Sequence, residues 1–283
     1  MKKKASVLLL SIGMILAAMP AIAEEKAAPA DKPFLTFPVS ITYYSAYWWR
    51  GVELNGKGAG LIWPQAGVNL GETGFSAFVA GGANVDYFAA SDSGDRKYAK
   101  TLHEFDAALA YTGEFAGMLV LGLGATYVKY YYYDAYDAAA KDPSFIEGLF
   151  SLGLKVPLNP RIDCYYDYYV KESAAKTPVD EDYYVSFSLT HDLISTDDGF
   201  KLTANPWVSY YNNAYLDRKG WSDAGLTLST TKDYKGTVFT ASVNYARSLS
   251  KDFQLPADID GDGNTGKLRN HFWAEFGVSR TLQ

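Results

Sequence analysis

The fold is decided by alternation, shown most clearly by the stretch Arg-Ile-Asp-Cys-Tyr-Tyr-Asp-Tyr-Tyr-Val-Lys at residues 161–171. Apolar or aromatic side chains at 162, 164, 166, 168 and 170 alternate there with residues that are mostly charged. Because successive side chains of a strand point to opposite faces, this period of two predicts a β-strand with one apolar and one polar face.

The same period recurs along the chain. We predict twelve strands, at residues 36–50, 60–70, 74–89, 101–112, 117–133, 144–156, 160–172, 180–192, 199–213, 220–232, 236–249 and 268–282. Short turns, such as 71–73 and 233–235, alternate with mostly longer polar loops, such as 90–100 and 250–267. This asymmetry is typical of outer-membrane proteins. The predicted fold class is therefore all-β, an antiparallel up-and-down transmembrane β-barrel of about 12 strands. An exported soluble sandwich is the alternative.

The first 23 residues have the character of a secretory signal peptide. A basic start at Lys2–Lys4 precedes an apolar stretch and the small-x-small sequence Ala21-Ile22-Ala23. The apolar stretch is short for a membrane-spanning helix. We therefore predict a signal peptide at 1–23, a flexible lead-in at 24–35 and a β-barrel domain at 36–283, located in the bacterial outer membrane with its lipid as partner.

Composition excludes several other classes of protein. Cys164 is the single cysteine, which excludes a disulfide scaffold, and a net charge of −6 argues against nucleic acid as a partner. Aromatic residues make up 16% of the chain. Many of them are expected at the strand ends nearest the longer loops, as in an outer aromatic girdle. These are Trp48, Trp49, Tyr87, Phe88, Tyr130–Tyr133, Tyr168, Tyr169, Tyr183, Tyr184, Tyr210 and Tyr211.

The segment Tyr-Ser-Ala-Tyr-Trp-Trp-Arg-Gly-Val at 44–52 resembles the first strand of a proteobacterial family of uncharacterised exported outer-membrane β-barrel proteins, which reads roughly Ser-Asp-Tyr-x-x-Arg-Gly-x-Ser. Ser45, Tyr47, Arg50 and Gly51 match that pattern, whereas Ala46 replaces its Asp. The resemblance implies a barrel and transfers no catalytic residue. The last strand is similar to the assembly signal of outer-membrane barrels, which implies the barrel-assembly machinery as a partner.

Strand parity places charged and aromatic side chains on the inner face. The expected lumen-lining residues are Arg50, Glu104, Asp106, Glu147, Lys155, Arg161, Asp163, Asp167, Lys171, Glu275, Trp63, Trp207 and Trp273, and the same parity adds Asp182, Lys201 and Asp223. An excess of inward acids favours cations in a pore. We expect porin-like passage or binding of small polar solutes with a weak cation preference. A non-conducting barrel with a structural or surface-binding role is the alternative, and it requires these acids and bases to pair.

No cofactor is expected, except that the sequence Asp-Ile-Asp-Gly-Asp-Gly-Asn at 258–264 resembles the start of a calcium loop. Asp258, Asp260 and Asp262 are the candidate ligands of a weak calcium site, although the twelfth position is Arg269 rather than Glu. The three histidines have no serine partner at a spacing suited to nucleophilic catalysis. The sequence therefore predicts that the protein is not an enzyme.

Overall fold

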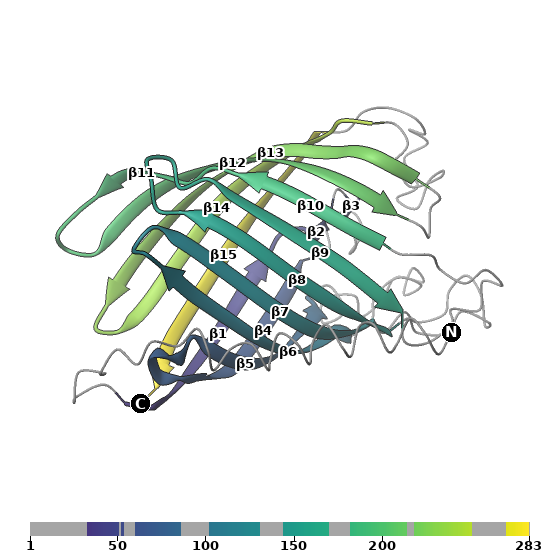
Figure 1. Ribbon diagram of the computed structural model, residues 1–283. Coiled ribbons are helices and arrows are strands. Elements are labelled where there is room, and N and C mark those ends of the chain that lie inside the picture. The colour runs from purple at the N-terminus through teal and green to yellow at the C-terminus, as the bar shows by residue number, and fades with distance from the viewer. Residues whose placement is uncertain are drawn as a thin grey trace, which may run out of the picture. The chain divides into compact units, whose positions relative to one another are not determined.

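The computed structural model describes residues 33–50, 52–53, 60–85, 102–130, 144–169, 182–213, 218–250 and 270–282. These residues form a closed antiparallel barrel with twelve strand positions in up-and-down order (Figure 1), which confirms the predicted fold class. The wall strands are β1 Leu35–Tyr44, β4 Leu61–Leu70, β5 Phe75–Asn84, β6 Leu102–Phe115, β7 Leu119–Tyr130, β8 Ser144–Leu154, β9 Arg161–Tyr169, β10 Asp182–Ser188, β11 His191–Ser195, β12 Phe200–Asn213, β13 Arg218–Tyr234, β14 Thr237–Ser248 and β15 Asn270–Leu282.

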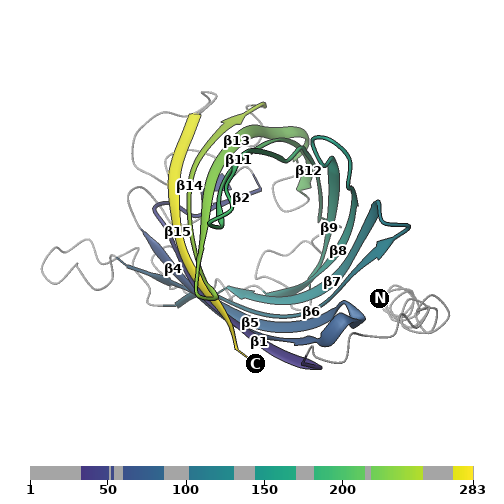
Figure 2. The ribbon, with the colours of Figure 1, turned by 90° about the vertical axis from the view of Figure 1, so that its left-hand side faces the viewer.

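Two pairings close the ring. The first and last strands, β1 and β15, run antiparallel to each other, and β10 pairs with both β9 and β12. The short strand β11 also pairs with β12, so β10 and β11 share one position in the wall, interrupted at Leu189 and Thr190. Seen along the barrel, the strands form a ring (Figure 2).

The short connections have the backbone conformations that tight turns require. Between β13 and β14, Lys235 (φ 53°) and Gly236 (φ 77°) are both left-handed. Two left-handed central residues define the type I′ turn, which matches the twist of a hairpin. After β4, the short 3₁₀ turn η2 (Gly71–Thr73) ends at Gly74 with φ 80°. Both turns fall where the sequence predicts short connections.

The outer surface of the wall is apolar. Phe272 is 71% exposed, Leu109 69% and Val243 62%, and all three lie within strands. On the opposite face, Asn244 beside Val243 is polar, Ala108 beside Leu109 is small, and both are buried. An outward apolar surface is the lipid-facing band of a membrane barrel. Among the described residues, no helix has the length and apolar character needed to cross a bilayer.

The predicted first strand, residues 36–50, extends too far along the chain, because β1 ends at Tyr44. The Ser45 amide donates to the Ala274 carbonyl at 2.9 Å, and the Ala274 amide donates to Ser45 Oγ at 2.8 Å. These bonds end the β1–β15 ladder, and the chain then turns away from the wall. It forms a small hairpin of β2 (Trp48–Trp49) and β3 (Val52–Glu53), with Arg50 in the turn, here named the inner hairpin. The placement of Trp48 and Trp49 in an outer girdle on the wall is therefore wrong.

Candidate functional site: an arginine that crosses the lumen

The inner hairpin delivers Arg50 to two carboxylates of the opposite wall. One guanidinium nitrogen, Nη1, donates to Asp167 Oδ2 at 2.5 Å, and the other, Nη2, donates to Asp167 Oδ1 at 3.2 Å. Nη2 also forms an ion pair with Glu147. The pair with Asp167 is bidentate, the arrangement in which arginine binds carboxylate with the best geometry.

Three tyrosine rings complete the surroundings of this guanidinium. Its central carbon lies 5.2 Å from the ring centroid of Tyr165, 5.5 Å from that of Tyr184 and 5.8 Å from that of Tyr211. Contacts within about 6 Å of an aromatic face attract a cation. We name the five residues Glu147, Asp167, Tyr165, Tyr184 and Tyr211 the Arg50 cage.

The position of the cage shows that the inner hairpin spans the bore. The hairpin leaves the wall at the end of β1, whereas the bidentate partner Asp167 lies on β9. In the ring of twelve positions, β9 is six positions from β1 in either direction. The two strands are therefore diametrically opposite, and Figure 2 shows β2 inside the ring. A chain that joins them has to cross the lumen and narrow it.

The wall places like charges directly beside one another at this level. Glu147 on β8 pairs in register with Asp167 on β9, and Asp167 pairs in register with Asp182 on β10. Like charges directly opposed on neighbouring strands destabilise a sheet. Burial lowers the pKa of Arg50, but the charges of Asp167 and Glu147 raise it by more, so its pKa lies above the ordinary value. Arg50 is thus a permanent cation that offsets the row of acids.

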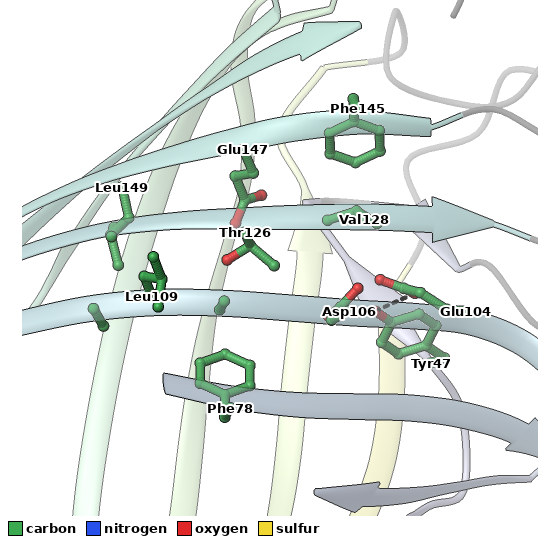
Figure 3. Close-up of a pocket in the computed structure, with 13 residues that line it drawn as sticks. Tyr47, Phe78, Glu104, Asp106, Leu109, Thr126, Val128, Phe145, Glu147 and Leu149 are labelled. Carbon is green, nitrogen blue, oxygen red and sulfur yellow. Dashed lines mark hydrogen bonds between the residues drawn. The ribbon is translucent and has the colours of Figure 1, made fainter. Parts of the chain in front are cut away.

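A second group of acids lies beside the inner hairpin, around Tyr47. The Tyr47 hydroxyl donates to Glu104 Oε2 at 3.0 Å, and its ring lies 5.7 Å from that of Trp63. Burial and then the charge of Glu104 raise the pKa of Tyr47, so the hydroxyl remains a donor. A cavity of about 240 Å³ adjoins these residues, lined also by Asp106 and Glu147 (Figure 3). The cavity lies between Tyr47 and strands β5 to β8, and its three carboxyl groups are set among mostly apolar side chains.

The other predicted lumen charges lie away from the Arg50 cage. Arg161 donates to Asp163 on the same strand at 2.8 Å, at the short-turn end of β9. Lys155 follows the end of β8 and pairs with the exposed Glu114, so it lies at the short-turn end of the barrel. Glu275 accepts from Trp273 Nε1 at 2.8 Å on β15. Lys171 and the calcium candidates Asp258, Asp260 and Asp262 lie outside the described residues. Within the described residues, no three His, Cys, Asp or Glu side chains are grouped to hold a metal ion.

The remaining predicted tryptophans pack on glycines of the neighbouring strand. A Cβ added at Gly225 would lie 2.4 Å from Trp207, and one added at Gly82 would lie 2.8 Å from Trp63. Each ring therefore lies against a strand position that has no side chain. The rings fill the space beside the wall.

Sequence reasoning missed the three tyrosines of the cage. Tyr184 and Tyr211 were expected in the outer girdle, but they are 9% and 1% exposed and face inward. Their chain neighbours Tyr183 and Tyr210 do face outward, where their rings stack at 6.2 Å. The signal was present in the alternation itself, because two consecutive strand residues point to opposite faces. One member of every Tyr-Tyr pair therefore has to face the lumen.

Comparisons with solved structures support the fold. No protein-family model and no curated protein sequence matches the chain. The NanC porin is 13% identical, with 86% of this chain and 98% of that chain covered and a TM-score of 0.50. The COG4313 outer membrane channel from Pseudomonas putida F1 is 12% identical, with 91% and 100% covered and a TM-score of 0.45. At this identity the likeness concerns the fold alone.

A third similar structure corrects the prediction about catalysis. LpxR from Salmonella typhimurium is 10% identical, with 87% of this chain and 99% of that chain covered and a TM-score of 0.44. The prediction that the protein is not an enzyme is contradicted, because LpxR, a barrel of similar structure, is an enzyme. The match is distant and assigns no reaction to this chain. The architecture and the similar proteins together indicate an outer-membrane β-barrel.

Proposed function

We propose that the barrel passes small polar solutes across the outer membrane, through a constriction formed by the inner hairpin, with a weak preference for cations. The observation that carries the proposal is the charge around this hairpin. Inward carboxylates of Glu104, Asp106, Glu147, Asp167 and Asp182 lie at the level of Tyr47 and Arg50. A surplus of acids at a constriction attracts cations and repels anions.

A specific observation favours a second candidate, the non-conducting barrel. Arg50 pairs with Asp167 and Glu147 across the bore, as expected of a plug. The cavity of about 240 Å³ beside the hairpin supports the conducting proposal instead, because it leaves room next to the ion pair. The two candidates differ in one property, the ionic current through the folded protein.

The test is single-channel recording of the refolded chain in a planar bilayer, under a potassium chloride gradient. We expect discrete current steps and a reversal potential on the cation-selective side. The double variant Glu104→Gln/Asp106→Asn should move the reversal potential toward zero, because it removes two carboxylates beside the hairpin. Asp198→Asn is the control, since Asp198 lies in an exposed turn and its loss removes charge away from the constriction. A protein that inserts and stays electrically silent would establish the non-conducting barrel.

A further inference from the structure

We propose that the Arg50 cage is a binding site for solutes that carry a guanidinium group, and that Arg50 occupies it as an internal substitute for such a solute. The inference rests on the proposed function in so far as a solute has to enter the lumen. It deepens that function by naming the class of solute and the means by which the constriction opens.

The chemistry of the cage fits a planar, forked cation. Asp167 receives two parallel N–H bonds from Arg50, and Glu147 receives a further one. Tyr165, Tyr184 and Tyr211 present their rings to the same group at 5.2 to 5.8 Å. A guanidinium offers donors in a fixed fork and a flat surface for aromatic contact, whereas an ammonium is a compact point charge. The cage therefore distinguishes a guanidinium from a simple cation.

The wall holds the cage in place independently of its occupant. Its five members lie on β8, β9, β10 and β12, which are hydrogen-bonded to one another in register. The Tyr184 hydroxyl donates to Ser209 Oγ at 2.6 Å, and the Tyr184 and Tyr211 rings meet edge to face at 5.7 Å. If Arg50 leaves, the register still places Glu147, Asp167 and Asp182 side by side, and their mutual repulsion favours a replacement cation.

Arg50 is held less firmly by the inner hairpin than the cage residues are held by the wall. The strands of the inner hairpin are two residues each, with two register pairs between them. Arg50 itself has a φ of 48°, in the left-handed region that a non-glycine residue adopts at a cost. Backbone strain of this kind recurs at ligand clamps and switches. A soluble guanidinium that takes the place of Arg50 releases the hairpin and widens the bore.

The experiment uses guanidinium chloride at low millimolar concentration as the probe, with sodium chloride at equal concentration as the control. The protein is the full refolded chain as Arg50→Ala, which leaves the cage empty. We expect guanidinium to raise the melting temperature of Arg50→Ala by several degrees in a saturable manner, because a ligand that binds the folded state stabilises it. Sodium should have no such effect. Wild type should respond at higher guanidinium concentrations, because Arg50 competes.

The double variant Arg50→Ala/Asp167→Asn is the matched control, and it should lose the response because the bidentate carboxylate is gone. Equal effects of guanidinium and sodium on Arg50→Ala would overturn the inference. If Arg50→Ala does not fold, as judged by heat-modifiable gel mobility, Arg50→Lys replaces it, since lysine keeps the charge without the fork. Guanidinium should then shift the melting of Arg50→Lys at lower concentration than that of wild type, and the same concentration dependence for both would overturn the inference.

Channel recordings separate this inference from the proposed function. A conducting barrel with identical responses to the two salts would contradict the inference and leave the porin role intact. A silent barrel whose Arg50→Ala variant binds guanidinium would contradict the porin role and leave the cage as a binding site. In a conducting wild type, guanidinium on the long-loop side should increase the current by widening the constriction.

Discussion

Arg50 shows how one side chain can be fixed by two carboxylates and three rings from the other side of a barrel. Its side chain is 4% exposed, and that of Asp167 is fully buried. Breaking a buried ion pair by removing one partner is costly, because the other charge loses its compensation. Arg50, which narrows the lumen, is therefore also expected to stabilise the folded barrel.

Arg50→Gln is expected to lower the free energy of unfolding by about 3 kcal/mol, and Asp167→Asn in the same chain should recover part of this loss. The recovery is partial because the double variant no longer buries the uncompensated Asp167 carboxylate but keeps that of Glu147. Urea unfolding of the protein in detergent micelles, followed by tryptophan fluorescence, measures both values in a double-mutant cycle. Arg161→Gln is the matched control, with an expected loss below about 1 kcal/mol, because its pair with Asp163 is half exposed. Equal losses for the two arginines would contradict the burial argument.

Neighbouring wall strands approach each other where a glycine on one strand leaves room for an aromatic ring on the other. Trp207 on β12 lies over Gly225, its register partner on β13. The missing side chain of Gly225 leaves the space that the Trp207 ring fills. Such pairs pin the register of neighbouring strands.

Gly225→Ala should destabilise the barrel by about 1–3 kcal/mol, because the added methyl overpacks the site. Its Cβ would lie 2.4 Å from both the Trp207 ring and the Tyr245 carbonyl. Gly153→Ala is the control, because a Cβ there meets no atom closer than 3.8 Å. Heat-induced loss of the folded gel band compares the two variants, and an equal loss would show that the effect comes from backbone propensity alone.

The turn between β11 and β12 provides a prediction of pH dependence. The Lys232 ammonium donates to Asp198 at 2.6 Å, and this bond together with that from Thr196 lowers the pKa of Asp198 to about 2. In the unfolded chain an Asp titrates near 3.9. A lowered pKa means that the turn is stabilised above about pH 3.9, and that this stabilisation is lost as the pH falls through about 2. Carbon NMR of the labelled carboxyl should show this midpoint, and Lys232→Gln should raise it.

The alternation predicts the strands of the barrel wall, but it does not predict the inner hairpin that crosses the lumen. Alternation has a local cause, because the position of a residue in its strand fixes the face to which its side chain points. The inward orientation of Glu147 and Asp167 could therefore be predicted from the sequence. The departure at Ser45 could not, because it depends on a hydrogen bond to Ala274, far along the chain. The meeting of Arg50 with Asp167 likewise depends on closure of the ring, and no local pattern encodes which inward residues face each other across it.

The barrel has an apolar outer surface and a charged lumen. Val243 lies in the middle of β14 and points outward, 62% exposed. In water that exposure would be unfavourable, whereas in a bilayer it faces hydrocarbon. An apolar outer surface over a polar interior is the reverse of a water-soluble protein, so this fold is stable in a lipid bilayer.

Val243→Arg is therefore expected to reduce the folding free energy in lipid vesicles by about 2–4 kcal/mol, as for a charge near the bilayer midplane. Tyr234→Arg is the control at the last residue of β13, where the expected cost is about 0–1 kcal/mol. Folding titrations in vesicles with urea as denaturant compare the variants. Similar costs at the two positions would contradict a span through the wall at Val243.

The crossing of the bore also constrains the order in which the molecule is assembled. Arg50 and Asp167 are 117 residues apart in the chain, and the strand that carries the hairpin is the one that joins β15 to complete the ring. Contacts between residues so far apart in the chain carry a loop-closure entropy cost and form slowly. The Arg50–Asp167 pair can therefore form only when β9 lies opposite β1 in the ring.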